Sequence, residues 1–170
     1  NQLQGVVEVD ETYVGGKHKG KRGRSTLTKT PVFGAVQRRG RLFITPVPNA
    51  KRKTLEPIIR SRVREGTHIM SDEWWAYTKL GDTYSHSVVK HKENEYVRGD
   101  IYTNTIEGAW SHLKRSMMGT YHRPSRKHLS KYCAEFEFTY NTRNYSPLAI
   151  FNNIIDKNLI RVGYSEIVGT

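Results

Sequence analysis

Three acidic residues lie where the neighbouring residues suggest a chemical role for a carboxylate. Asp10 follows a β-branched, strand-like run, Asp72 follows a short apolar run, and Glu107 lies in the first turn of the clearest helical segment. Aspartate is disfavoured in strand interiors, and open crevices form at the strand ends of an α/β sheet. We therefore expect Asp10 and Asp72 at strand ends, with Glu107 converging on them.

Converging carboxylates in a basic protein predict bound divalent cations. Adjacent carboxylates repel and raise each other's pKa, so they require positive charge between them. Mg²⁺ and Mn²⁺ are hard cations that take carboxylate oxygens and leave coordination positions for phosphate. Two such ions clamp the attacking and leaving oxygens of a phosphodiester displacement. Asp10, Asp72 and Glu107 are therefore the candidate ligands of two ions.

Each acid also has an ordinary structural explanation. Asp10 fits an edge strand whose polar face meets water. Asp72 fits the N-cap of a following helix. Glu107 fits a capping box, with Asn104 as the N-cap and Glu107 at the third helical position. A cap can also be a ligand, so spacing alone does not decide between the two roles of Glu107.

The clearest predicted element is a helix over residues 104–118, which has two parallel stripes. Its apolar stripe comprises Ile106, Ala109, Trp110, Leu113 and Met117, at helical spacing. The polar stripe beside it comprises Asn104, Glu107, Ser111 and Lys114. Lys114 lies two turns after Glu107 on the same flank, where it could hold DNA phosphate next to the metals. An exposed helical lysine is the commoner explanation.

The remaining elements predict a mixed sheet covered by helices. Residues 6–14, 31–37 and 42–47 form an antiparallel meander in this prediction, and two further strands span 67–70 and 84–89. Helices are expected over 51–65, 73–80, 104–118, 125–143 and 146–155, with Ser125 as an N-cap. Inward-facing residues of helix 125–143 are Leu129, Tyr132, Cys133, Phe136 and Tyr140. Strands followed by strand–helix alternation indicate an α/β fold.

The charge balance predicts a polyanionic partner. The chain has 28 Lys and Arg against 16 Asp and Glu, a net charge of +12. A charged run is usually a solvated face, but cations unrelieved by any acid repel one another unless an anion binds. We expect nucleic acid, through phosphate contacts and counterion release, ahead of an acidic membrane surface. The acid-free span between Glu11 and Glu56 contains Lys17, Lys19, Lys21, Arg22, Arg24, Lys29, Arg38, Arg39, Arg41, Lys51, Arg52 and Lys53.

Composition also excludes several classes. At 170 residues, the chain is expected to be a single domain over 1–170, with a mobile basic loop at about 15–30 and C-terminal helices at about 125–155. It shows no apolar run of membrane-spanning length and no signal-peptide pattern. Its single cysteine, Cys133, excludes a disulfide framework or a Cys-rich zinc site and indicates a reducing compartment. Because the chain begins with Asn1, we expect an excised domain or a leader ahead of it.

Three blocks of the sequence resemble the catalytic blocks of DDE transposases. They are VDETYVGG at 9–16, SDEWWAY at 71–77 and NTIEGAWSHLKR at 104–115. The resemblance is greatest to the insertion-sequence group of the ISXO kind, which is related to eukaryotic Merlin-type transposons. Residues 119–122 and 140–143 also resemble that group, so the similarity runs from about 6 to 155.

The resemblance implies a ribonuclease H-like fold, with a mixed five-stranded sheet flanked by helices. It also implies divalent-metal-dependent DNA cleavage and strand transfer. Asp10, Asp72 and Glu107 match the three acids, and Lys114 matches the basic residue after the last one. The third acid is sometimes asparagine in this group, so Asn104 remains a rival or helper to Glu107.

The implied cofactors are two Mg²⁺ or Mn²⁺ ions, and the implied partner is double-stranded DNA, as transposon ends and target. We expect a homodimer on DNA, no membrane association, and a location in the cytoplasm or nucleoid of a bacterium or the nucleus of a eukaryote. Relatives usually carry an N-terminal zinc-binding or helix-turn-helix region, which this sequence does not show. The residues expected to bind DNA are Lys17, Lys19, Lys21, Arg22, Arg24, Lys51, Arg52, Lys53 and Arg115.

Three other functions compete with a transposase. A domesticated, non-catalytic DNA-binding module would keep the basic surface, but the presence of all three acids argues against it. A ribonuclease H-like nuclease that cuts without joining uses the same metal site, so the sequence does not separate it from a transposase. A basic structural protein gives no account of Asp10, Asp72 and Glu107.

Overall fold

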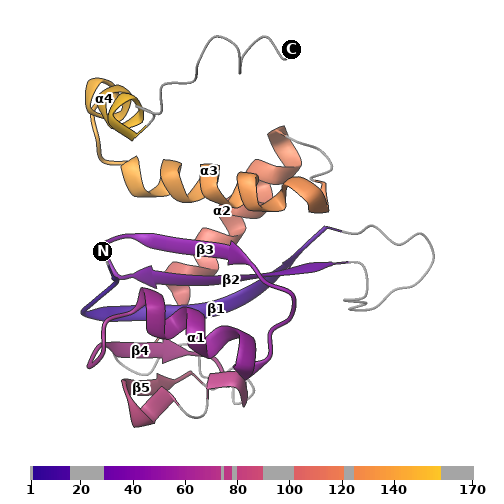
Figure 1. Ribbon diagram of the computed structural model, residues 1–170, viewed down its shortest axis with the longest axis vertical. Coiled ribbons are helices and arrows are strands. Elements are labelled where there is room, and N and C mark those ends of the chain that lie inside the picture. Colours follow the sequence, from indigo (N-terminus) through magenta and orange to yellow (C-terminus); the bar gives the residue numbers. More distant parts are fainter. Residues whose placement is uncertain are drawn as a thin grey trace, which may run out of the picture.

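The computed structural model describes residues 2–15, 29–73, 75–77, 80–89, 102–120 and 125–157. These residues form a five-stranded sheet in the order β3-β2-β1-β4-β5, with β1 in the centre (Figure 1). β2 and β3 continue β1 as an antiparallel meander, whereas β4 and β5 run parallel to it. The strands are β1 (Val6–Val14), β2 (Thr30–Gln37), β3 (Leu42–Pro46), β4 (His68–Ser71) and β5 (Ser85–Val88). The predicted fold class, a ribonuclease H-like mixed sheet flanked by helices, is confirmed.

The central strand β1 explains where Asp10 lies. Side chains alternate along the strand, so Val7 and Val9 face one core while Glu8 and Asp10 face the other. The alternative explanation of Asp10, that β1 is an edge strand whose polar face meets water, is wrong, because β2 and β4 pair with its two sides. The prediction that Asp10 ends the strand is also wrong, because pairing with β2 continues to Val14. Pairing with β4, however, stops at Glu8, so β1 is unpaired on that side at Asp10.

One face of the sheet is covered by α1 (Arg52–Arg62) and by the short 3-10 helices η1 (Trp75–Tyr77) and η2 (Leu80–Asp82). Leu55 and Ile59 of α1 pack with Val7 and Val9 of β1. The helix predicted over 73–80 is wrong, since the described part of this region forms 3-10 turns. A segment this short does not offset the cost of nucleating an α-helix.

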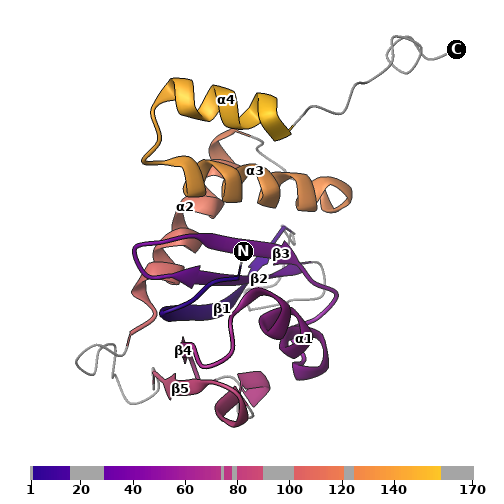
Figure 2. The ribbon, with the colours of Figure 1, turned by 60° about the vertical axis from the view of Figure 1, so that its left-hand side comes forward.

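The opposite face is covered by α2 (Asn104–Thr120) and α3 (Leu129–Thr142), which Figure 2 shows across the sheet from α1. The predicted apolar stripe of α2 is confirmed, since all five of its residues are buried. In α3, Leu129 and Cys133 are buried and the predicted aromatic residues pack partly buried against this core. The predicted helix 125–143 begins with the 3-10 helix η4 (Arg126–His128). Ser125 is its N-cap by position but makes no side-chain capping bond.

The edge strand β3 is shielded by side chains of α3. Asn141 accepts a hydrogen bond from the Leu42 amide at 2.7 Å and donates one to the Leu42 carbonyl at 2.8 Å. Glu137 accepts one from the Ile44 amide at 3.0 Å. These contacts occupy the groups that an added strand would need, so this edge is protected from pairing with another chain.

The last described helix, α4 (Pro147–Lys157), lies beyond α3 and away from the sheet (Figures 1 and 2). It exposes several large apolar side chains, in contrast to the buried stripe of α2. They are Leu148, Phe151, Ile154 and Ile155. None of the helices in the described ranges combines the length and the apolar character that crossing a membrane requires.

Candidate active site

Asp10 and Asp72 lie on neighbouring parallel strands. The ladder pairs Glu8 of β1 with Met70 of β4. The same register, carried two residues further, sets Asp10 beside Asp72, which directly follows β4. The structure thus brings these two predicted site residues together, at the end of their shared ladder. The element that follows Asp72 among the described residues is the 3-10 helix η1, and not the α-helix that the capping explanation of Asp72 requires.

The charge on Asp10 is strongly disfavoured in the fold. Burial raises its pKa from 3.8 to about 8, and the neighbouring charges of Glu11 and Asp72 add to that effect. The indole Nε1 of Trp110 donates a hydrogen bond to Asp10 Oδ2 at 2.9 Å, which lowers this pKa only in part. A buried carboxylate beside two other acids is therefore the dominant electrostatic feature of this site.

Trp110 depends on a glycine in β2 for its position. Gly34 pairs with Asp10 across the β1–β2 ladder. A Cβ added at Gly34 would lie 2.4 Å from Cη2 of Trp110, so any larger residue would displace the ring. The sequence assigned Trp110 only to the apolar stripe, and its polar contact with Asp10 was missed. A tryptophan beside a polar stripe is a weak signal for such a contact, because a buried indole N–H needs a partner.

A fourth acid, Glu11, was also missed by the sequence reasoning. Its carboxylate accepts a hydrogen bond from the Tyr77 hydroxyl at 2.6 Å, on the α1 side of the sheet. Burial raises the pKa of Glu11 to about 7, and the charge of Asp72 contributes. Burial and the charge of Glu11 likewise hold the pKa of Tyr77 well above its usual range. The adjacency of Glu11 to Asp10 was the available signal.

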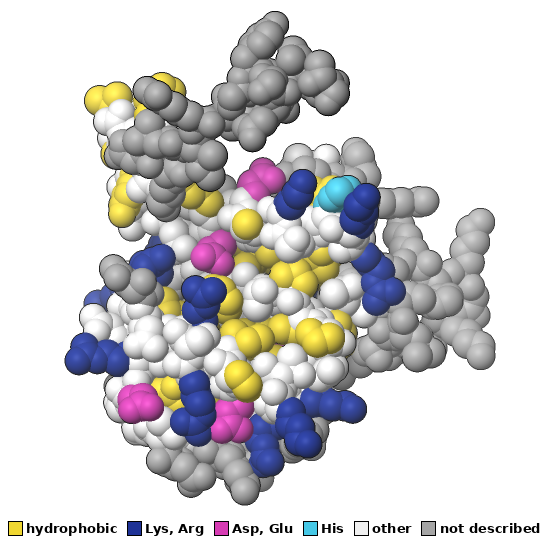
Figure 3. Space-filling model, viewed as in Figure 1, with side chains coloured by type: hydrophobic (Ala, Val, Ile, Leu, Met, Phe, Trp, Pro, Cys, Tyr) yellow, Lys and Arg dark blue, Asp and Glu magenta, His cyan; other side chains and the backbone are white. Residues whose placement is uncertain are grey.

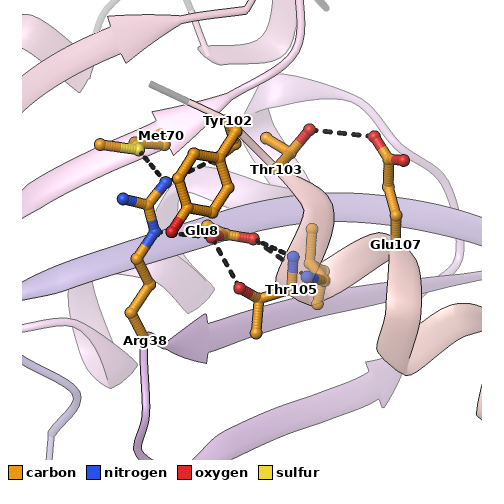
Figure 4. Close-up of polar contacts among 8 residues, drawn as sticks. Glu8, Arg38, Met70, Tyr102, Thr103, Thr105 and Glu107 are labelled. Carbon is orange, nitrogen blue, oxygen red and sulfur yellow. Dashed lines mark hydrogen bonds and ion pairs between the residues drawn. The ribbon is translucent and has the colours of Figure 1, made fainter. Parts of the chain in front are cut away.

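The third predicted acid, Glu107, lies on the exposed flank of α2. The Thr103 hydroxyl donates to Glu107 Oε1 at 3.0 Å (Figure 4). The Glu107 amide donates to the Thr103 carbonyl at 3.1 Å. Thr103 therefore occupies the N-cap position, and the alternative in which Asn104 is the N-cap is wrong. The predicted polar stripe is confirmed, because its members Asn104, Glu107, Ser111 and Lys114 are all exposed.

A carboxylate from β1 supplies the hydrogen-bond acceptors for the first turn of α2. Glu8, fully buried, accepts hydrogen bonds at Oε2 from the amides of Thr105 at 2.8 Å and Ile106 at 3.0 Å (Figure 4). These amides are the orphan donors of a helix N-terminus, which a side chain from the same helix usually satisfies. The alternation of β1 placed Glu8 on the face of Asp10, but the sequence did not predict its partners.

A comparison with known protein families identifies the family to which this chain belongs. The family model of the ISXO2-like transposase domain matches residues 2–141. The chain belongs to this family. It is a transposase family of the DDE type, and such transposases generally use divalent metal ions. The match includes β1, β4 and the whole of α2.

Two relatives place this transposase domain among proteins of mobile elements. A protein in transposable element ISH50 of Halobacterium salinarum is 30% identical over 153 residues, covering 79% of this chain and 52% of the relative. A transposase-like protein of Haemophilus influenzae is 25% identical over 122 residues, covering 71% of this chain and 98% of the relative. The domain thus spans about half the length of the halobacterial relative. No solved structure matches the chain.

The donor set of the transposase domain fits a divalent cation only in part. Asp10 and Asp72 supply the carboxylate oxygens that Mg²⁺ and Mn²⁺ prefer, and their mutual repulsion is the kind that a cation relieves. Among the described residues, no group of three His, Cys, Asp or Glu side chains is arranged to hold a metal ion. Glu107, which contacts Thr103, is not grouped with the two aspartates in this structure.

The basic residues predicted to bind DNA do not form one surface within the described residues. Lys51, Arg52 and Lys53 lie at the start of α1, on one face of the sheet. Arg115 and Lys114 lie on α2, on the other face, and both are exposed. Figure 3 shows several separate groups of Lys and Arg side chains on one side of the molecule. The other predicted residues, Lys17, Lys19, Lys21, Arg22 and Arg24, lie outside the described residues.

Proposed function

We propose that this transposase domain cleaves DNA and joins the freed end to a target, with Asp10, Asp72 and Glu107 as its catalytic acids. The observation that best supports this proposal is the β1–β4 register, which sets Asp10 beside Asp72 where their ladder ends. The raised pKa of Asp10 supports it further, because burial beside two other acids disfavours the charged carboxylate and a bound cation would relieve that cost.

In this proposal the acids share two divalent ions. Asp10 contributes to both sites, Asp72 completes one and Glu107 completes the other. Two bound ions would supply charge at the attacking and leaving oxygens of the phosphodiester. Glu107 joins the aspartates by rotating away from Thr103, which an exposed side chain in a first helical turn does readily.

The protein groups provide position and charge in both steps. Water attacks phosphorus in line in the cleavage step, and the freed 3′-hydroxyl does so in the joining step, without a covalent enzyme intermediate. Lys114, exposed two turns after Glu107 on the same helix flank, would hold a DNA phosphate in this proposal. Asn104, one turn before Glu107 on that flank, remains the alternative third ligand.

The domain would act wherever the element's DNA resides: the cytoplasm or nucleoid of a bacterium, or the nucleus of a eukaryote.

The experiment that tests this function uses labelled duplexes carrying the element's ends together with a circular target. In Mg²⁺ or Mn²⁺ we expect nicked ends and joined products, and in EDTA neither. Absence of any metal-dependent cleavage would contradict the proposal. Cleavage that never yields a joined product would instead identify a nuclease of this fold.

Neutralising the basic residues between Lys17 and Arg24 should make the affinity for DNA depend less steeply on salt concentration. For duplex DNA, removing one phosphate-binding cation reduces the slope of log K against log salt by roughly 0.9. We expect a shallower slope when Lys17, Lys19, Lys21, Arg22 and Arg24 are replaced by neutral residues. The measurement is binding of a labelled duplex by fluorescence anisotropy over a salt series. Neutralisation of exposed Lys131 on α3 is a single-charge control. An unchanged slope would make the segment a solvated surface only.

We also propose that the domain acts as a homodimer on DNA, with α4 in the interface. The exposed apolar residues of α4 support this, because a helix with an exposed apolar face gains free energy by packing. Replacing Phe151, which is 61% exposed, by aspartate should convert dimer to monomer in sedimentation equilibrium. Asn152→Asp, which adds the same charge at a neighbouring exposed position, should leave the dimer intact. A wild-type chain that is monomeric with and without DNA would contradict the proposal.

A further inference from the structure

The strand that carries Asp10 and the helix that carries Glu107 are joined by one buried carboxylate. Glu8 lies two residues before Asp10 on the same face of β1. Its Oε2 accepts the amides of Thr105 and Ile106, and its Oε1 accepts the Thr105 hydroxyl at 2.9 Å. Ile106 directly precedes Glu107. Glu8 therefore fixes both the position and the rotation of the first turn of α2 relative to β1.

The partner of Glu8 extends this connection to the strand that leads to Asp72. Arg38, which directly follows β2, donates Nε to Glu8 Oε1 at 2.7 Å. Its Nη2 donates to Met70 Sδ in β4 at 2.8 Å and to the Tyr102 carbonyl at 2.8 Å. Its guanidinium also stacks on the Tyr102 ring, 3.5 Å from the centroid (Figure 4). Met70 lies two residues before Asp72, and Tyr102 lies in the segment that enters α2.

We propose that the Glu8–Arg38 pair is a positioning device that sets the three acids relative to one another. The pair contacts β1, β4 and α2, in each case at a residue one or two positions before Asp10, Asp72 or Glu107. These contacts are with residues beside the acids, so the pair acts through the backbone that carries the acids. This inference rests on the proposed function, because it assigns the pair a role only if the acids bind metal together.

The energetics of a buried ion pair favour a positioning role over a purely stabilising one. Glu8 is fully buried and Arg38 is mostly buried. The desolvation of such a pair offsets much of its attraction, so apolar residues of similar volume often replace it without loss of stability. An apolar pair, however, would supply neither the two helix-capping acceptors nor the fork that reaches Met70 and Tyr102. Replacing the pair should therefore disturb the site geometry through both contacts, and Arg38→Lys, which keeps Glu8 as the cap, tests the fork alone.

The deciding variant is the apolar double substitution Glu8→Leu/Arg38→Met. We expect it to fold and to bind DNA as the wild type does. We expect its Mn²⁺ affinity, measured by calorimetry or electron paramagnetic resonance, to fall by about 10–100-fold, as when other supports of metal ligands are removed. At saturating Mn²⁺ its kcat for cleavage should fall while its KM for DNA stays unchanged. A folded double variant with wild-type Mn²⁺ affinity and kcat would overturn the proposal.

A conservative substitution keeps the test valid if the double variant does not fold. Arg38→Lys retains a cation for Glu8 but lacks the planar fork that reaches Met70 and Tyr102. The proposal predicts a folded protein with weakened Mn²⁺ binding that excess Mn²⁺ restores. If Arg38→Lys binds Mn²⁺ with wild-type affinity, the contact of Arg38 with β4 does not position the acids, and the proposal is overturned.

Two reference variants separate this inference from the proposed function. Glu56→Gln breaks the exposed Arg60–Glu56 pair of α1, 2.9 Å long, and should leave Mn²⁺ binding unchanged. Asp10→Asn should abolish Mn²⁺ binding whatever the role of Glu8. If the wild-type protein and Asp10→Asn do not differ in Mn²⁺ binding, the proposed function itself is contradicted. Asp10-dependent binding that survives in both Glu8–Arg38 variants would contradict only the positioning role.

Discussion

Replacing either Asp10 or Asp72 by asparagine is expected to abolish DNA cleavage while the fold and the affinity for DNA remain. An amide occupies the same space as the carboxylate but binds a hard cation poorly. In Asp10→Asn, the amide oxygen can still accept the hydrogen bond of Trp110, so the local packing should persist. The measurements are Mg²⁺-dependent strand cleavage, circular dichroism and duplex binding. Cleavage retained by either variant would remove that residue from the site.

Asp10→Asn should also stabilise the metal-free protein at alkaline pH. The fold raises the pKa of Asp10 from 3.8 to about 8, so it favours the neutral form. This stabilising contribution is present below pH about 4 and is lost as pH rises towards 8. In EDTA at pH 8, Asp10→Asn should therefore melt above the wild type, and near pH 4 the two should converge. Added Mn²⁺ should reverse the order at pH 8, because only the wild type binds it.

An exposed acid provides the control for this pH dependence. Glu65→Gln also removes one negative charge but at an exposed position. It should shift the melting temperature equally little at both pH values, since surface charges contribute little to stability. If Asp10→Asn behaves like Glu65→Gln in EDTA, the charge on Asp10 is not disfavoured by the fold.

Glu107→Gln is expected to reduce cleavage by orders of magnitude with little loss of stability. Glutamine can still accept the hydrogen bond of the Thr103 hydroxyl, so the free energy of unfolding should fall by roughly 1 kcal/mol or less. As a metal ligand, by contrast, Glu107 supplies a charge that glutamine lacks. Melting temperature and Mg²⁺-dependent cleavage should be measured together. Cleavage at near wild-type rates would make Glu107 a structural residue of the first turn only.

Asn104→Ala is the counterpart that tests the alternative third ligand. Asn104 is exposed and is not the N-cap, so its replacement by a strong helix former should leave stability nearly unchanged. Thr103→Ala should instead remove the hydroxyl that donates to Glu107 Oε1 and lower the free energy of unfolding by about 1 kcal/mol. Loss of cleavage in Asn104→Ala, with normal cleavage in Glu107→Gln, would identify the asparagine as the ligand.

Local sequence patterns predicted the elements of this fold well. The apolar stripe of α2 has helical spacing, and the alternation of β1 separates Val7 and Val9 from Glu8 and Asp10. Such periodicities report which face of an element is buried, and burial dominates the free energy of folding. The resemblance of three blocks to DDE transposases supplied the ribonuclease H-like fold in which these elements are arranged. The family match over residues 2–141 confirms that resemblance.

The contacts that the sequence could not predict are those between distant segments. Glu8 caps α2 from 97 residues away, so no local cap signal identified it, and the cap was assigned to Asn104 instead. The position of Asp10 in mid-strand likewise follows from the register, because β2 pairs with β1 beyond the point where β4 stops. Pairing lengths on the two sides of a strand depend on tertiary structure, and residue types do not encode them locally.

The most direct test of the proposed active site is a crystal structure of the domain soaked in Mn²⁺, with anomalous diffraction measured to locate the metal. We expect two Mn²⁺ ions among the carboxylates of Asp10, Asp72 and Glu107, with the Glu107 side chain turned away from Thr103. Mn²⁺ bound elsewhere, or no Mn²⁺ at these acids in protein that still cleaves DNA, would contradict this assignment of the site.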